Sequence, residues 1–140
     1  MTATKTLRAL LWVMGVAVVA IAIYHLAGGI FSVPGTASFS DSARATVDSR
    51  ERFYSAIFAG YGLGWIWAAR QPLIPTSAVD ALAGVFLLGG LGRVVSLLGY
   101  GWPHWFQVPE AGIELVLPFL FFALAARERA TQQQVLSAPR

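Results

Sequence analysis

Four long runs of apolar residues, separated by short polar stretches, dominate this sequence. They cover residues 9–30, 49–70, 78–100 and 106–126. A bilayer core about 30 Å thick is crossed by roughly 20 residues of α-helix, and each run approaches or exceeds that length. We therefore expect an all-α fold, an integral membrane bundle of four transmembrane helices.

Local signals mark where these helices begin and end. Asp48, with Glu51 three residues later, fits a capping box at the start of the second helix. Pro72 and Pro103 follow the second and third runs, and charged residues 127–129 end the fourth.

The ends of the chain and its longest connection are polar. We expect a four-helix transmembrane domain over residues 1–130 and a frayed polar tail over residues 131–140. The connection over residues 31–47, rich in Ser, Thr and charges, is predicted to be a functional loop or a short surface helix.

Composition supports a membrane protein. Of the 140 residues, 56% are hydrophobic and 12% are charged, whereas soluble domains have about 25% charged residues. Lys5 and Arg8 precede the first run as in a signal peptide, but that run is longer than the usual apolar region of about 7 to 15 residues, so we expect a retained helix. Cysteine is absent, which excludes disulfides and thiol catalysis.

The basic residues predict an orientation. They lie at the borders of apolar runs rather than on one face, which argues against nucleic acid as a partner. With the amino terminus inside, more of them are cytoplasmic than external, so we expect both termini in the cytoplasm. The inner set is Lys5, Arg8, Arg70, Arg127, Arg129 and Arg140, and the outer set is Arg44, Arg50 and Arg52.

Several polar side chains fall at one depth in the outer half of the bilayer. Counted at 1.5 Å per residue from the middle of each run, His25 lies about 8 Å outward, Arg93 about 6 Å and Glu114 about 4 Å. Tyr24 and Tyr54 lie at similar depths. Because a charge at the bilayer centre costs about 2.5–3.5 kcal/mol, Arg93 and Glu114 should face the bundle interior and pair.

Glu110 and Pro118 extend this picture. Glu110 lies one turn before Glu114, so Arg93 can choose between two carboxylates and leave one to take a proton. Pro118 lacks the N–H that would bond the Glu114 carbonyl, which predicts a bend and an exposed acceptor. Proline is also simply common in membrane helices.

Other features have structural explanations of equal or greater weight. The glycines favour close helix packing, in a Gly60–Gly64 GxxxG pair and at Gly84, Gly89, Gly90 and Gly92. Tryptophan and histidine near the helix ends are typical of interfacial anchors, namely Trp65, Trp67, Trp102, His104 and Trp105. A histidine such as His25 is by default a core residue bonded to Tyr54 or a carbonyl. We expect no metal site and no cofactor.

Parts of three runs resemble a known family. The matching segments are Arg52 and Phe53, residues 60–64, residues 89–97, Gly101 with Pro103, and residues 114–117. They resemble the bacterial membrane family called domain of unknown function 4345. The resemblance implies a small four-helix bacterial membrane protein, similar in shape to the DoxX-like group, with no activity to carry over.

We hypothesise that the chain binds a lipid-like or small apolar molecule in the outer half of the bilayer. Whether it is an enzyme stays open; Glu114, Glu110 and His25 are the candidate proton carriers, with Arg93 controlling the protonation of the glutamates. Alternatives are an accessory subunit of a larger membrane complex and a small proton-coupled transporter. Partners would be membrane lipid, another membrane protein or a second copy. The expected ligand-binding residues are Tyr24, His25, Arg52, Tyr54, Tyr61, Arg93, Glu110 and Glu114.

Overall fold

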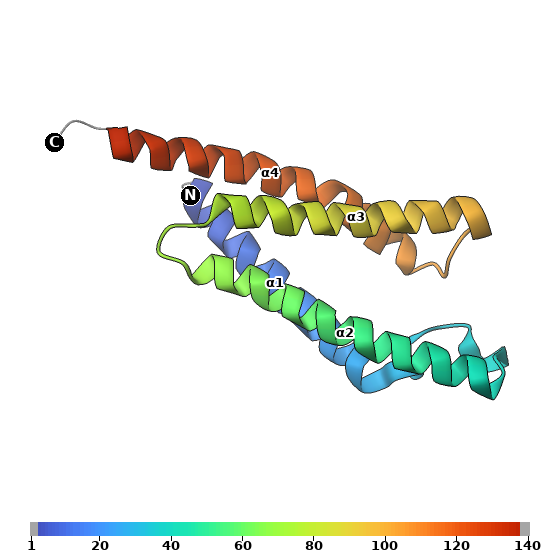
Figure 1. Ribbon diagram of the computed structural model, residues 1–140. Coiled ribbons are helices and arrows are strands. Elements are labelled where there is room, and N and C mark those ends of the chain that lie inside the picture. Colours follow the sequence, from blue (N-terminus) through green and yellow to red (C-terminus); the bar gives the residue numbers. More distant parts are fainter. Residues whose placement is uncertain (1–2, 138–140) are drawn as a thin grey trace. The chain divides into compact units, whose positions relative to one another are not determined.

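The computed structural model, which describes residues 3–137, is built of helices (Figure 1). In chain order these are α1 (Ala3–Gly28), the short 3-10 helices η1 (Gly29–Ser32) and η2 (Thr36–Ser38), α2 (Asp41–Arg70), α3 (Thr76–Tyr100) and α4 (Gln107–Ser137). The all-α prediction is confirmed.

Three of the described helical segments are long and apolar enough to cross a membrane: Ala3–Ser32, Thr76–Tyr100 and Gln107–Ser137. At most 28% of the most apolar stretch of each is buried within the chain, as expected of a membrane protein whose helices face lipid. The expected fourth span, α2, does not qualify. Its first half carries six charged residues and its second half mixes Gly, Tyr and Trp into the apolar run, which lowers its hydropathy.

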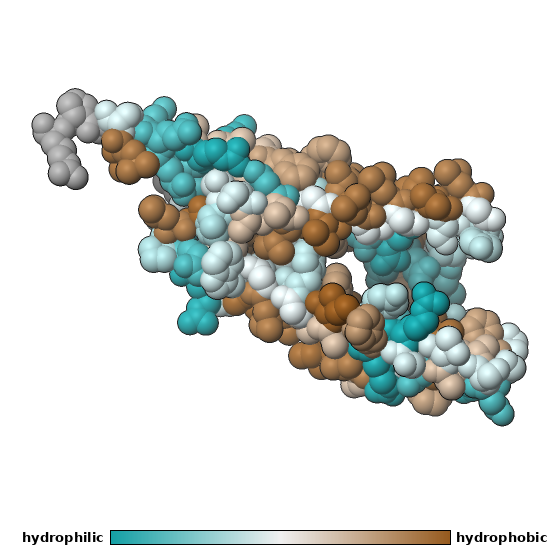
Figure 2. Space-filling view, in the orientation of Figure 1, coloured by the Kyte–Doolittle hydropathy of each residue, from teal (hydrophilic) through white to brown (hydrophobic). Residues whose placement is uncertain are grey.

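Contacts divide the chain into two compact units: Met1–Leu10 with Ala68–Arg140 (unit 1), and Leu11–Trp67 (unit 2). In unit 1, α3 and α4 pack side by side as an antiparallel pair. Figure 2 shows hydrophobic residues over their surface and hydrophilic residues towards the carboxyl end of α4. The buried core of unit 1 includes Leu7, Ile74, Val79, Ala83, Pro118, Phe121, Leu124 and Ala125.

The carboxyl half of α4 is longer than predicted. The sequence places the end of this helix near residue 126, yet the helix continues to Ser137. Glu128 explains the extension: it is only 4% exposed, and its carboxylate accepts hydrogen bonds from Thr4 (2.6 Å) and Gln132 (3.1 Å). Gln132 also donates to the Ile74 carbonyl (3.2 Å), so the polar end of α4 is held by other segments.

In unit 2, two glycines bring α1 and α2 into close contact. A Cβ on Gly15 would lie 2.6 Å from the Ile66 side chain, and one on Gly62 would lie 2.9 Å from the α1 backbone. The predicted Gly60–Gly64 pair is not this contact surface, because Gly60 has no neighbour within 4 Å of such a Cβ. At Gly15 and Gly62, the absence of a side chain allows the two helices to approach closely.

The start of α2 also differs from the prediction. Asp48 and Glu51 lie inside α2 and not at its start, so the predicted capping box is wrong. The helix begins at Asp41, and Ser40 supplies the cap through a bond from the Ala43 N–H to the Ser40 hydroxyl (3.4 Å). Residues 31–47 therefore contain the end of η1, η2 and the first turns of α2.

Candidate functional site

Arg93 of α3 joins two carboxylates of α4. Its Nε donates to Glu114 Oε2 at 2.7 Å, and its Nη2 lies 3.2 Å from Glu110 Oε2. The Glu114 side chain is 14% exposed, against 39% for Glu110, so the shorter bond is also the more buried one. The expected pairing of Arg93 with Glu114 is present. The guanidinium does not bind one carboxylate with two parallel bonds; it bridges both.

Gly90 positions this cluster. It lies one turn before Arg93, and a Cβ there would lie 3.0 Å from Glu114 Cβ and 3.1 Å from its carbonyl carbon. The missing side chain thus allows α3 and α4 to come close at the residue that Arg93 binds. Pro118, fully buried, lies inside the continuous helix α4 one turn after Glu114, whose carbonyl therefore lacks its usual helical N–H partner.

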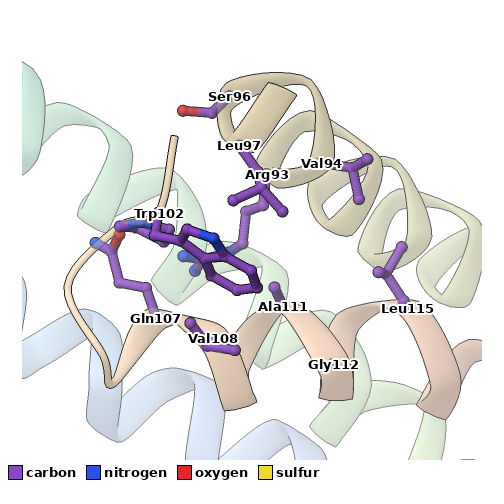
Figure 3. A pocket seen from close by; sticks show the side chains of 11 residues that line it. Arg93, Val94, Ser96, Leu97, Trp102, Gln107, Val108, Ala111, Gly112 and Leu115 are labelled. Atoms are coloured by element: carbon purple, nitrogen blue, oxygen red, sulfur yellow. The ribbon is translucent and has the colours of Figure 1, made fainter. Parts of the chain in front are cut away.

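A pocket of about 220 Å³ adjoins Arg93, between the last turns of α3, the connector and the first turns of α4 (Figure 3). Glu110 and Glu114 do not line it. The lining residues are Arg93, Val94, Ser96, Leu97, Trp102, Pro103, Gln107, Val108, Ala111, Gly112 and Leu115. An apolar wall with a few polar groups is typical of small-molecule sites.

Sequence reasoning missed most of this pocket. Trp102 reads as an interfacial anchor, and it does lie 78% exposed, yet it also forms one wall. Gly112 also lines the pocket, and nothing lies within 4 Å of the place where its Cβ would be. The available signals were the Trp102–Pro103 pair in the connection and a glycine midway between Glu110 and Glu114, two residues from each.

A second polar cluster lies in unit 2, around His25. His25 Nδ1 lies 2.8 Å from Glu51 Oε1 and 2.9 Å from Ser32 Oγ. The Ser32 hydroxyl donates its own proton to the Gly29 carbonyl at 2.6 Å, so Nδ1 is the donor to both oxygens. The histidine is thus a satisfied residue, as expected by default, but its partners are Glu51 and Ser32 rather than Tyr54. The group is not a catalytic triad, because both partners share one ring nitrogen.

Asp48 and Arg52 connect α2 to η1. Asp48 Oδ1 accepts the Ile30 N–H at 2.9 Å, Asp48 Oδ2 accepts from Arg52 Nε at 2.9 Å, and Arg52 Nη1 donates to the Leu26 carbonyl at 2.6 Å. The hydrogen bond from Arg52, followed by the one from Ile30, holds the pKa of Asp48 below its usual range. Gly29, at φ +52°, lies against both side chains and leaves no room for a Cβ.

Comparison with known proteins gives a family. The family model described as Domain of unknown function (DUF4345) matches residues 6–125. The chain belongs to this family. No match was found among curated proteins or among solved structures.

The DUF4345 match covers all eight expected site residues, which the structure divides between the two units. Arg93, Glu110 and Glu114 meet in unit 1. The other five belong to unit 2, where Arg52 binds Asp48 and His25 binds Glu51. A single layer formed across all four helices stays a prediction.

The three tyrosines of unit 2 contact aromatic neighbours. Tyr24, 63% exposed, packs edge-on against His25, and Tyr54, 56% exposed, packs edge-on against Phe53. Tyr61 stacks on Phe58 and also packs edge-on against Trp65. In this DUF4345 member the Arg93 cluster of unit 1 adjoins a pocket, which makes it the candidate binding site.

Proposed function

We propose that this protein binds a lipid-like or small apolar molecule in the pocket beside Arg93. The observation that carries the proposal is the pocket itself: an apolar cavity between α3 and α4 with an arginine in its wall. Placing a guanidinium in an apolar helix costs free energy that ion pairing only partly recovers. A hydrogen bond from Arg93 to a polar group of a bound molecule would recover more of that free energy.

The proposed setting is the outer half of a bacterial inner membrane. Residues 53–69 of α2 contain no charged residue and extend about 26 Å as helix, the lower limit for a span, so α2 would be the fourth transmembrane helix. Lys and Arg counts favour both termini in the cytoplasm. The α3–α4 connector and the pocket would then lie near the external surface, in a four-helix arrangement similar to the DoxX-like group.

The proposed function is ligand binding, and it does not require a reaction. If a reaction occurs, Glu110 is the carboxylate best placed to exchange a proton, because it makes the longer contact to Arg93 and is more exposed than Glu114. Glu114 would then hold the guanidinium in position. His25 would be a separate proton carrier in unit 2.

The proposal is tested by filling the pocket. Gly112 lines the pocket and has nothing within 4 Å of the place of a Cβ, so Gly112→Leu adds bulk at the pocket wall without displacing a neighbour at that Cβ. Gly84→Leu is the matched control, since Gly84 also has nothing within 4 Å of a Cβ and does not line the pocket. Native mass spectrometry of the protein extracted in mild detergent should show a retained molecule in wild type and Gly84→Leu, and none in Gly112→Leu. Equal retention in all three would refute the proposal.

Arg93→Gln combined with Glu114→Gln tests the polar wall. Both substitutions remove the more buried ion pair together, and the charge that stays is that of Glu110, whose side chain is 39% exposed. The expected result is a changed profile of retained molecules in a protein that still folds. An unchanged profile would show that the arginine does not contact the ligand.

A second candidate function is that of an accessory subunit in a larger membrane complex. Three glycines leave open helix faces where a partner helix would fit: Gly60 on α2, and Gly84 and Gly92 on α3. Here the roles of the two variants reverse. Co-purification of one partner at fixed ratio, lost in Gly84→Leu and kept in Gly112→Leu, would favour the subunit.

A further inference from the structure

The Arg93 cluster has an excess of negative charge. One guanidinium (+1) contacts two carboxylates (−2), which gives a net charge of −1 when both glutamates are ionised. An anion entering the adjoining pocket would therefore meet a guanidinium whose charge the two carboxylates behind it outweigh, in surroundings that screen charge poorly. The site differs in this respect from an arginine that is free to bind a fatty-acid carboxylate.

Each of the four polar side chains that line the pocket, Arg93, Ser96, Trp102 and Gln107, can donate a hydrogen bond. Within residues 3–137, Arg93 Nη1 and the side-chain polar groups of Ser96, Trp102 and Gln107 have no hydrogen-bond or ion-pair partner. The guanidinium and the indole can only donate, and the hydroxyl and amide can donate or accept. The two carboxylates, the acceptors that an ammonium group would need, bind Arg93 outside the lining.

The size of the pocket limits what it holds. A volume of about 220 Å³ corresponds to roughly seven water molecules at ~30 Å³ each, which is less than a whole lipid. A small polar end and its first few carbons fit, and the rest of an alkyl chain would lie along the exposed apolar side chains of α3 and α4.

Resting on the proposed function, we infer that the pocket selects a neutral amphiphile whose polar end accepts hydrogen bonds, such as an ester or ketone carbonyl. Arg93 Nη1 donates to the carbonyl oxygen, and the Ser96 hydroxyl, the Gln107 amide and the Trp102 indole supply further donors. The carboxylates keep the guanidinium fixed and repel anions.

A matched series of ligands tests this selectivity. Methyl dodecanoate, dodecanoate and dodecylammonium share one chain and differ only in the charge and hydrogen bonding of the polar end. Binding is measured by native mass spectrometry on purified protein at about pH 9, where the carboxylic acid is ionised. The ester should bind about tenfold or more tightly than either ion. Equal or tighter binding of dodecanoate or dodecylammonium would overturn the inference.

Two variants separate this inference from the proposed function. Gly112→Leu should abolish binding of the ester; if all three ligands bind that variant as they bind wild type, the pocket is not the site and both proposals fail. If Gly112→Leu blocks binding but an ion is preferred, only the ligand class is wrong. Glu110→Gln brings the cluster to zero net charge (+1 − 1). The affinity for dodecanoate relative to that for the ester should therefore rise several-fold. An unchanged ratio would refute the electrostatic explanation.

Discussion

Alanine at position 90 introduces a methyl group into the contact between α3 and α4. The new Cβ would lie 3.0 Å from Glu114 Cβ and 3.1 Å from the Glu114 carbonyl carbon. Neither atom is the end of a flexible side chain, so relief requires the helices to separate by a few tenths of an ångström. Gly89→Ala is the matched control, because its Cβ would meet only a Glu114 carboxylate oxygen at 3.9 Å, an ordinary contact distance.

The magnitudes follow from two opposing effects. Replacing glycine by alanine inside a helix stabilises it by roughly 0.5–1 kcal/mol, and both variants gain this. Overpacking a close contact costs about 1–3 kcal/mol, and only Gly90→Ala pays it. We therefore expect Gly90→Ala to unfold with about 1–3 kcal/mol less free energy than Gly89→Ala.

The difference is measured by denaturant titration in detergent, followed by circular dichroism. A second readout is the NMR resonance of the Arg93 Nε–H, which should shift in Gly90→Ala because the bond from Nε to Glu114 lengthens. Stabilities of the two variants within about 0.5 kcal/mol of each other, together with an unmoved Nε–H resonance, would refute the role given to Gly90.

The remaining predictions concern unit 2. Gly29→Ala should be more destabilising than Gly35→Ala, which costs only the roughly 1–2 kcal/mol of a left-handed backbone because it has open space around it; equal thermal midpoints would count against the contact at Gly29. The lowered pKa of Asp48 means that its stabilising effect is complete above about pH 4 and is lost as pH falls through the lowered value. The Ile30 amide proton should therefore change its NMR shift only below about pH 4, and Asp48→Asn should abolish that step. His25→Ala, which removes both Nδ1 contacts, should cost about 1–3 kcal/mol in thermal unfolding, and a neutral result would contradict the hydrogen-bond assignment.

The sequence predicts the features that burial in a membrane requires, namely long apolar helices and paired charges. The bounds of α3 follow from an apolar run ended by Gly101, which has φ +86°. The pairing of Arg93 with Glu114 follows from the cost of leaving either charge in hydrocarbon. Glu110 joins them because it lies one helical turn from Glu114 on the same helix.

Features that depend on distant segments were not predictable from local pattern. The extension of α4 depends on Thr4, far away in the chain, which donates to Glu128. Asp48 matches a capping box in sequence, yet Ser40 begins the helix earlier and leaves Asp48 to bind η1. The pocket depends on the path of the α3–α4 connector and on the missing side chain of Gly112, neither of which has a motif.

The central claim is that an apolar molecule occupies the pocket beside Arg93, and intermolecular NOEs test it most directly. Protonated methyl dodecanoate is added to isotope-labelled protein in deuterated detergent. The account predicts NOEs to the Trp102 indole, Val108 and Gly112, with few to Val116, which lies 70% exposed on α4 outside the pocket. NOEs spread evenly over Val116 and the pocket residues, or none to the pocket, would contradict it.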